Sequence, residues 1–177
     1  SGAGKSPMDE LIDQTKSILN EKKIISKNFT KQIAFNAIPH IDDFLDDGYT
    51  KEELKMVNET NKILDDKIEI TATCVRIPVM ISHAESVNIE FEKNVTPLEI
   101  KNALESAEGC IVMDDPSSIK YATPIDAEGK NETFISRIRA DKSRKNSINL
   151  WIVSDNLLRG AALNAVEIAE TYYNNFK

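Results

Sequence analysis

Three stretches of the chain place apolar residues at the three- and four-residue spacing of an amphipathic helix. The first begins at Ser6 and Pro7, with the serine as the expected cap and the proline as the first helical residue. The other two begin at a threonine followed three residues later by a glutamate, which is the capping-box pattern. The predicted helices therefore start at Ser6, run from Thr50 to about Leu64, and run from Thr96 to about Ala107.

Strict alternation of apolar and polar residues predicts extended segments elsewhere. Val87, Ile89 and Phe91 are separated by polar residues, which is typical of a strand buried on one face. The segment from Ile68 to Val79 alternates in the same way but carries an arginine, Arg76. Shorter extended segments are expected at Ile33–Ile38, Cys110–Met113, Thr133–Arg139 and Ile148–Val153.

The last predicted helix, from Asn156 to Tyr173, has apolar residues on almost every side. Such a helix needs to be covered on every side. Helices and strands are interspersed along the chain, without an internal repeat or a low-complexity linker. We therefore expect one compact α+β domain, with a mixed β-sheet and helices packed on it.

The composition narrows the class of protein. A length of 177 residues allows a sizeable core, and a net charge of -7 argues against a nucleic-acid or anionic-membrane partner. No apolar run reaches membrane length, and no signal peptide is found. Cys74 and Cys110 are too few for a disulfide scaffold, so we expect reduced thiols and a cytoplasmic protein. The two histidines and two cysteines are too scattered to predict a metal site.

Arg76 and His83 are the strongest candidates for chemistry. A guanidinium in an apolar strand is costly unless it meets an anion, and arginine can grip a carboxylate through two parallel hydrogen bonds. Histidine can transfer protons near neutral pH. Two plainer interpretations stay open: Arg76 pairs with a structural acidic residue, and His83 is a turn residue. The side chains converge only if the chain bends between them, for example at Pro78 or near Ser82.

The segment TATCVRIPVMISHAES, from Thr71 to Ser86, resembles the active-site segment of the aspartate-semialdehyde dehydrogenase family. The resemblance extends in the same order over nearly the whole chain, and several matching residues are polar ones that the fold alone does not require. The other matching segments are AFNAIPHID (34–42), YTKEELKMVNET (49–60), FISRIRAD (134–141) and LWIVSDNLLRGAALNAVEIAE (150–170).

Members of this family are considerably longer and begin with a Rossmann domain, followed by a catalytic cysteine and a glutamine before a Ser-Gly-Ala-Gly segment. This chain opens at that segment, and no strand precedes its glycines to make a dinucleotide fingerprint. The resemblance therefore implies a C-terminal fragment that is inactive alone. It also implies a substrate-binding and dimerisation domain over residues 1–155. The helix at 156–177 would then pack on the missing Rossmann domain.

The resemblance also implies roles for individual residues in reducing aspartyl phosphate to its semialdehyde with NADP, a step in lysine, methionine and threonine biosynthesis. His83 would be the general acid/base, and Arg76 would hold the α-carboxylate of the small-molecule substrate. Glu52 would meet the substrate amino group and Lys55 the phosphate, although a surface ion pair is the plainer interpretation of two residues three apart. Ser1, Gly2 and Asn156 match cofactor-binding positions; Gly2 also fits a flexible end, and Asn156 a helix cap.

Other functions stay open beside this one. The chain could be a non-catalytic dimerisation or regulatory module that keeps the sequence without the chemistry. It could also belong to a related reductase that acts on an N-acetyl-glutamyl phosphate or a malonyl thioester. The combination of Glu52 and Arg76 favours an amino-acid substrate, because it offers one charge for an ammonium and one for a carboxylate. A homodimer is expected in either case from the resemblance.

Overall fold

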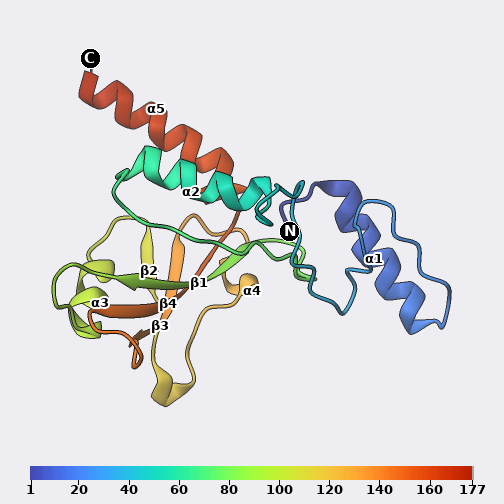
Figure 1. The fold of residues 1–177 in the computed structure, drawn as a ribbon, viewed down its shortest axis with the longest axis horizontal. Helices are drawn as coiled ribbons and strands as arrows, with labels where there is room; N and C mark the ends of the chain where they lie inside the picture. Colours follow the sequence, from blue (N-terminus) through green and yellow to red (C-terminus); the bar gives the residue numbers. More distant parts are fainter. Residues whose placement is uncertain (177) are drawn as a thin grey trace. The chain divides into compact units, whose positions relative to one another are not determined.

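The computed structural model describes residues 1–176, and Figure 1 shows its helices and strands. The chain forms two compact units. The first consists of Ser1 and the segment from Ala3 to Pro78. The second begins at Val79 and also takes in Gly2. The expected boundary at residue 155 stays a prediction.

The first unit is organised by helix α1 (Lys5–Leu19). Its apolar side packs in a small core with the loop that follows, made of Leu11, Ile33, Ala34 and Ile38 with Ile18 and Phe29 at its margin. The helix begins one residue before the predicted cap: Gly4 occupies the capping position without a side-chain bond, and Ser6 lies within the first turn. The prediction of Ser6 as the cap was wrong, because its hydroxyl donates instead to Asn28 Oδ1, 3.3 Å away.

Helix α2 (Lys51–Ile63) starts where the capping box predicted. The Glu53 amide donates to Thr50 Oγ1 over 3.3 Å, and the Thr50 amide donates to Glu53 Oε2 over 2.8 Å. Both residues are buried. The reciprocal pair satisfies two backbone donors that a helix otherwise leaves without partners.

The segment around Arg76 is extended but is not part of a sheet, so the prediction of a strand from Ile68 to Val79 was wrong. It forms one isolated antiparallel bridge, between Ile38 and Arg76, with both N–H···O distances at 2.9 Å. On the other side of the bridge, Pro39 has no N–H to offer and Phe35 adopts a left-handed backbone with φ 57°. The segment around Ile38 is therefore too irregular to pair with the Arg76 segment beyond this single bridge.

The second unit contains a mixed four-stranded sheet, which confirms the expected α+β class. Its strands are β1 (His83–Glu90), β2 (Cys110–Val112), β3 (Thr133–Ala140) and β4 (Ser147–Ser154), in the order β1-β4-β3-β2. β4 is antiparallel to both of its neighbours, whereas β2 runs parallel to β3. β1 ends at Glu90, one residue before Phe91, where the predicted alternation ended, although the Phe91 amide still donates to the Asn146 carbonyl over 2.8 Å. The connection after it leads to α3 (Pro97–Glu105).

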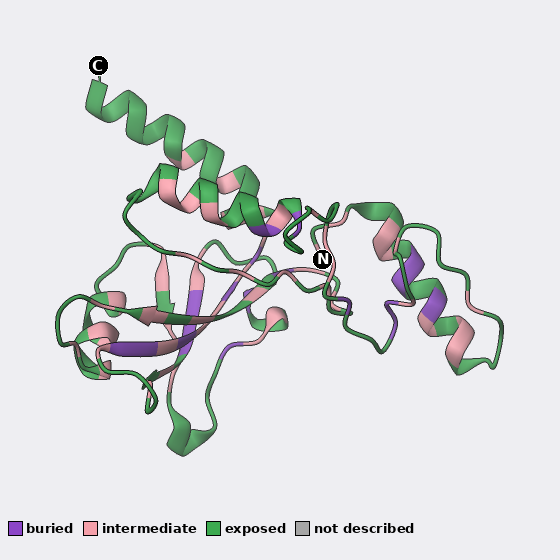
Figure 2. Ribbon diagram, viewed as in Figure 1, coloured by how far each residue is buried: buried purple, intermediate pink, exposed green. Residues whose placement is uncertain are grey.

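Both faces of this sheet carry buried apolar residues, and Figure 2 shows buried segments within its strands. On one face, Ile135, Ile148 and Leu150 are buried with residues of α3, Ile100 and Leu104, packed against them. The other face is covered by the connection between β2 and β3, which contains the short helices η1 (Pro116–Ser118) and α4 (Pro124–Ala127). The core on that face is formed by Ala122, Ala127, Phe134 and Val153.

The strand β3 contains a bulge that the alternation pattern did not reveal. Its register shifts between Ser136 and Arg139, and Arg137 has a left-handed backbone with φ 56°. The Asp114 carboxylate accepts the two amides that the bulge leaves without ladder partners, from Arg137 at 2.8 Å and Ile138 at 3.0 Å. A side chain thus replaces the missing strand at this position.

The last helical region differs from the predicted single helix. A π-helical turn, η2 (Leu158–Ala162), precedes the regular helix α5 (Leu163–Phe176). No residue of α5 is buried. Its large exposed apolar residues are Val166, Ile168, Tyr172, Tyr173 and Phe176. Among residues 1–176, no helix is long and apolar enough to cross a membrane.

Candidate functional site

In the first unit, the two candidates on α2 lie on one face of the helix, as their spacing predicted. The Lys55 ammonium is 3.7 Å from Glu52 Oε1, and the two side chains are 54% and 33% exposed. An exposed pair of this kind contributes at most about 1 kcal/mol of stability. Opening this ion pair so that each group binds a charged ligand would therefore cost little free energy.

The backbone of Arg76 is held in place, and in the described part of the chain its guanidinium is not paired with a carboxylate. The bridge to Ile38 holds the main chain, and Arg76 Nη1 donates to the Ser1 carbonyl oxygen over 3.2 Å. Arg76 is half-buried. Within residues 1–176 its guanidinium forms no ion pair with a carboxylate, so the structure does not support the interpretation of Arg76 as half of a structural salt bridge. The structure brings Ser1 and Arg76 together, in one unit with Glu52 and Lys55.

Glu53 connects the two segments that carry these candidates. The sequence analysis did not predict this connection. Besides its bond to Thr50, its carboxylate accepts the Cys74 amide over 2.9 Å. The hydrogen bonds from the Cys74 and Thr50 amides, in that order, outweigh burial and hold the pKa of Glu53 below its ordinary value. The capping box predicted the bond to Thr50, but no local pattern predicts a bond to a residue 21 positions away.

In the second unit, three predicted residues lie together: Gly2, His83 and Asn156. His83 is the first residue of β1, not a residue beyond the end of a strand that contains Arg76. It follows Ser82, which is buried and has a left-handed backbone with φ 73°. A Cβ atom added to Gly2 would lie 2.7 Å from His83 Nε2 and 3.9 Å from Asn156 Nδ2. Any other residue there would force the His83 ring to shift, and the φ of +72° is strained for a side chain.

Asn156 is oriented by the backbone next to the histidine. Its Oδ1 accepts the Ser82 amide over 2.9 Å, so its amide nitrogen is the end that lies toward Gly2. The structure does not support the alternative interpretation of Asn156 as a helix cap, because its oxygen accepts from Ser82 while Asp155 accepts the amides at the start of the helical region. The buried Asp155 carboxylate accepts the amides of Leu157, Leu158 and Gly129 at 2.8, 3.3 and 2.9 Å. An aspartate directly before the predicted helix start at Asn156 was a signal that could have identified it.

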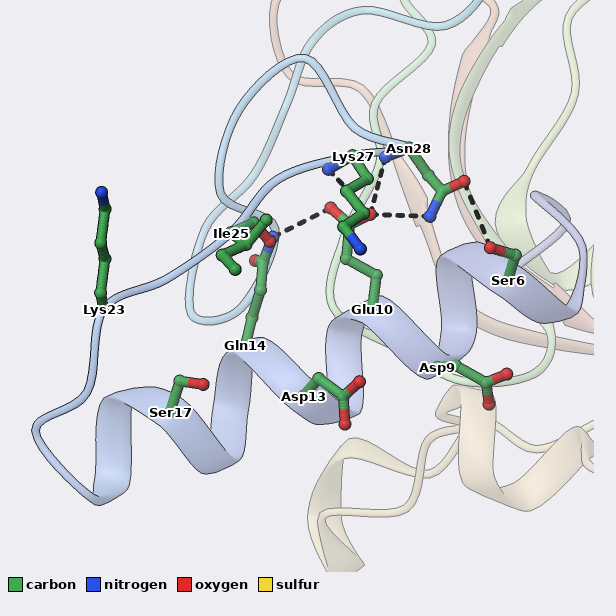
Figure 3. Close-up of a pocket in the computed structure, with 10 residues that line it drawn as sticks. All are labelled: Ser6, Asp9, Glu10, Asp13, Gln14, Ser17, Lys23, Ile25, Lys27 and Asn28. Atoms are coloured by element: carbon green, nitrogen blue, oxygen red, sulfur yellow. Dashed lines mark hydrogen bonds between the residues drawn. The ribbon is translucent and has the colours of Figure 1, made fainter.

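A pocket along α1 offers no comparable chemistry (Figure 3). Its central carboxylate, Glu10, already accepts hydrogen bonds from Gln14, from the Lys27 amide and from both the backbone and side chain of Asn28. The remaining lining residues are Ser6, Asp9, Asp13, Ser17, Lys23 and Ile25. This network fixes the loop after α1 against the helix. In the described part of the chain, no three His, Cys, Asp or Glu residues are grouped so that they could hold a metal ion.

The structure thus forms two separate clusters from the predicted residues. Ser1 and Arg76, with Glu52 and Lys55 on α2, belong to the first unit. Gly2, His83 and Asn156 belong to the second. A common site for Arg76 and His83 stays a prediction.

Comparison with known proteins agrees with the sequence pattern. Residues 1–159 match the family described as the semialdehyde dehydrogenase dimerisation domain. The aspartate-semialdehyde dehydrogenase of Aquifex aeolicus is 49% identical over 172 residues, which are 96% of this chain and 51% of that protein. The chain thus spans about half the length of the curated relatives it matches.

Solved structures show the same relation. Aspartate semialdehyde dehydrogenase II of Vibrio cholerae, complexed with ASA, superposes with a TM-score of 0.95 and 44% identity over 100% of this chain and 52% of that one. The Candida albicans enzyme with NADP, at 23% identity and a TM-score of 0.65, shares the fold over 80% of this chain and 45% of its own. The chain belongs to the semialdehyde dehydrogenase dimerisation-domain family.

Proposed function

We propose that this chain supplies the substrate-binding and dimer-forming part of an aspartate-semialdehyde dehydrogenase. The observation that carries the proposal is Arg76: a half-buried guanidinium, fixed by its backbone, that forms no ion pair with a carboxylate within residues 1–176. Such a group is well suited to receive the carboxylate of a small substrate, because it offers two parallel hydrogen bonds.

The residues on α2 supply the charges that complement the rest of an aspartyl substrate. Glu52 would bind its ammonium group, and Lys55 would bind the phosphate as a compact point charge. Their ion pair would open when the substrate binds. The loss would be small, because the Lys55 side chain is 54% exposed and the Glu52 side chain 33% exposed.

His83 would act as the general acid/base. In the oxidative direction, a cysteine from a part of the enzyme outside this chain adds to the aldehyde and forms a hemithioacetal. His83 then takes the hydroxyl proton as hydride leaves the carbon, which produces a thioester. Phosphate attacks this thioester and releases the thiolate, and aspartyl phosphate leaves. In the reductive direction, His83 returns the proton to the same oxygen.

Ser1, Gly2 and Asn156 are our candidates for contact with the nicotinamide end of NADP. When bound, the nicotinamide accepts or donates the hydride. Asn156 fits this role, because its oxygen is engaged by Ser82 and its amide N–H groups are left as donors for a carboxamide. Gly2 lets the backbone approach closely, since it has no side chain. The residues that read the ribose phosphate would lie elsewhere in the protein.

The remaining expectations belong to the whole protein. The family is described as a dimerisation domain, which supports a homodimer, and α5 would pack on the dinucleotide-binding domain through its exposed apolar residues. On this view, residues 1–155 form the substrate-binding and dimerisation domain. We place the protein in the cytoplasm, with small-molecule substrates and without a nucleic-acid or membrane partner.

The test is an assay of the complete protein that contains this chain, with aspartate semialdehyde, inorganic phosphate and NADP. We expect phosphate-dependent formation of NADPH, and little activity with N-acetylglutamate semialdehyde or malonate semialdehyde. A preference for either of the latter would assign the chain to a related acyl reductase. Absence of turnover with all three aldehydes, in a protein that still dimerises, would favour the non-catalytic module.

A further inference from the structure

A single buried carboxylate joins the two segments of the first unit that carry its charged candidates. Glu53 Oε2 accepts the Thr50 amide over 2.8 Å, and Glu53 Oε1 accepts the Cys74 amide over 2.9 Å. The side chain crosses from the first turn of α2 to the extended segment two residues before Arg76. Glu53 is 7% exposed, so this carboxylate is not available to a ligand.

The two residues that this carboxylate joins, one at the start of α2 and one on the extended segment, each lie close to a charged candidate. Glu52 precedes Glu53 on α2, and Lys55 lies within the same turn. On the other segment, Cys74 and Arg76 are two residues apart on an extended chain, and the bridge to Ile38 fixes the second of them. The Glu53 carboxylate is therefore the buried link between the α2 charges and the Arg76 segment, and the exposed contact of Tyr49 Oη with Thr71 Oγ1 at 3.2 Å is a second, outer one.

We propose that Glu53 is a positioning residue that sets the distance between Glu52 on α2 and Arg76, and so selects substrates that carry both an ammonium and a carboxylate group. This inference rests on the proposed function of the same residues. Glu53 itself touches no substrate and acts only through the two segments that it joins.

A carboxylate suits this position better than its amide. Both of its partners are N–H donors, and an ionised glutamate offers two acceptor oxygens and no donor. A glutamine would turn an NH₂ group toward one of the two amides and break that bond. Its lowered pKa, caused by the Cys74 and Thr50 amides, keeps Glu53 ionised over the working range of such an enzyme.

The test compares three variants of the complete protein in the oxidative assay: Glu53→Gln, Thr50→Ala and Glu59→Gln. We expect Glu53→Gln to raise the KM for aspartate semialdehyde roughly ten- to a hundredfold, because the substrate spans both segments. The KM for phosphate should stay within about twofold, since Lys55 keeps its place on α2 and phosphate does not reach Arg76. If the substitution only frayed the helix, it would lower the fraction of active enzyme and leave the KM values for both the semialdehyde and phosphate unchanged.

The other two variants are matched controls. Thr50→Ala removes the cap on the Glu53 amide but leaves the bond to Cys74, so it should lower Tm with a near-normal KM for the semialdehyde. Glu59 is exposed on the same helix, and its substitution removes an equal charge without either tether. If Thr50→Ala raises this KM as much as Glu53→Gln does, Glu53 is only part of a cap and the proposal is wrong.

A second measurement on the chain itself separates this proposal from the proposed function. In ¹H–¹⁵N spectra, Glu53→Gln should shift the amide signals of Cys74 and Arg76 and speed their hydrogen exchange, while Glu59→Gln should leave them in place. Unchanged Cys74 and Arg76 signals would refute the positioning role even if the enzyme assay succeeds. Shifted signals in a protein without activity would instead mean that only the proposed function had failed. If Glu53→Gln does not fold, Glu53→Asp, which is too short to reach both amides, should give the same results.

Discussion

The backbone around His83 leaves little freedom for its neighbours. Ser82 has a left-handed conformation, its amide is engaged by Asn156, and Gly2 lies so close to the imidazole that a methyl group would not fit. These constraints concern geometry more than stability. They place the Gly2 backbone and the Asn156 amide on the side of an exposed histidine.

The first residue-scale prediction concerns His83. In the complete enzyme, His83→Asn should lower kcat by about a hundred- to ten-thousandfold, because the amide cannot take or give a proton. The KM for the semialdehyde should change little, since in our assignment other residues bind its charged groups. Steady-state kinetics measure both. A variant with kcat within about threefold of wild type would show that His83 is a structural turn residue.

The second concerns Arg76. Arg76→Lys should raise the KM for the semialdehyde and lower kcat/KM, because an ammonium cannot reproduce two parallel bonds to a carboxylate. The bond to the Ser1 carbonyl could still form with a lysine, so folding should be preserved. Circular dichroism serves as the control for folding. Near-normal kinetics in this variant would mean that Arg76 does not bind substrate.

At the scale of elements, local signals predicted more than long-range ones. Thr50 and Thr96 each start a helix with a complete capping box, and the alternating residues of β1, β3 and β4 do form strands. The Arg76 segment alternates equally well yet finds only one bridge, because strand formation also needs a partner of matching length.

The same distinction applies to the candidate site. Residue types and spacing identified Arg76, His83 and the α2 pair as candidates, and the structure places Gly2 and Asn156 beside His83. The long-range bonds of the Glu53 and Asp155 carboxylates were missed, because each accepts an amide more than 20 residues away. Such a bond depends on the folded chain and leaves no periodic mark in the sequence.

Asp155 gives a prediction at this scale, because its carboxylate joins the start of the last helical region to Gly129. Asp155→Ala should lower the free energy of unfolding by about 1–3 kcal/mol, through the lost cap and the buried amides left without an acceptor. Urea unfolding measures the change. Asp126→Ala, which removes an exposed cap from the short helix α4, is the control and should cost less. Equal losses would show that burial of Asp155 adds nothing.

Glu10 on α1 gives a prediction about pH. Burial by itself would raise its pKa, but the hydrogen bonds from Asn28 and Lys27 outweigh this effect and lower the pKa below the ordinary value of 4.5. A lowered folded-state pKa stabilises the protein above pH 4.5, and this contribution is lost as the pH falls through the folded-state value. Glu10→Gln should therefore have a lower Tm than wild type at pH 7, and the difference should narrow in acid. A constant difference across this range would contradict the assignment.

At the scale of the whole molecule, two features indicate that part of the surface is meant to be covered. The helix α5 exposes a row of large apolar side chains, and β1 is an edge strand with a neighbour on one side only. The matching family is described as a dimerisation domain, which favours a contact between identical copies. A closed contact of this kind is most simply two-fold and self-complementary.

We therefore predict that the chain self-associates as a two-fold dimer through its sheet. Sedimentation velocity over a range of concentrations should show a single dimer species, because a closed symmetric contact stops at two copies. Non-specific apolar contacts through the exposed residues of α5, without a fixed geometry, would instead give a ladder of larger species. Val166→Glu on α5 separates the two cases, since it should leave a sheet-mediated dimer intact. A clean monomer at tens of micromolar, or aggregates that this substitution abolishes together with the dimer, would overturn the prediction.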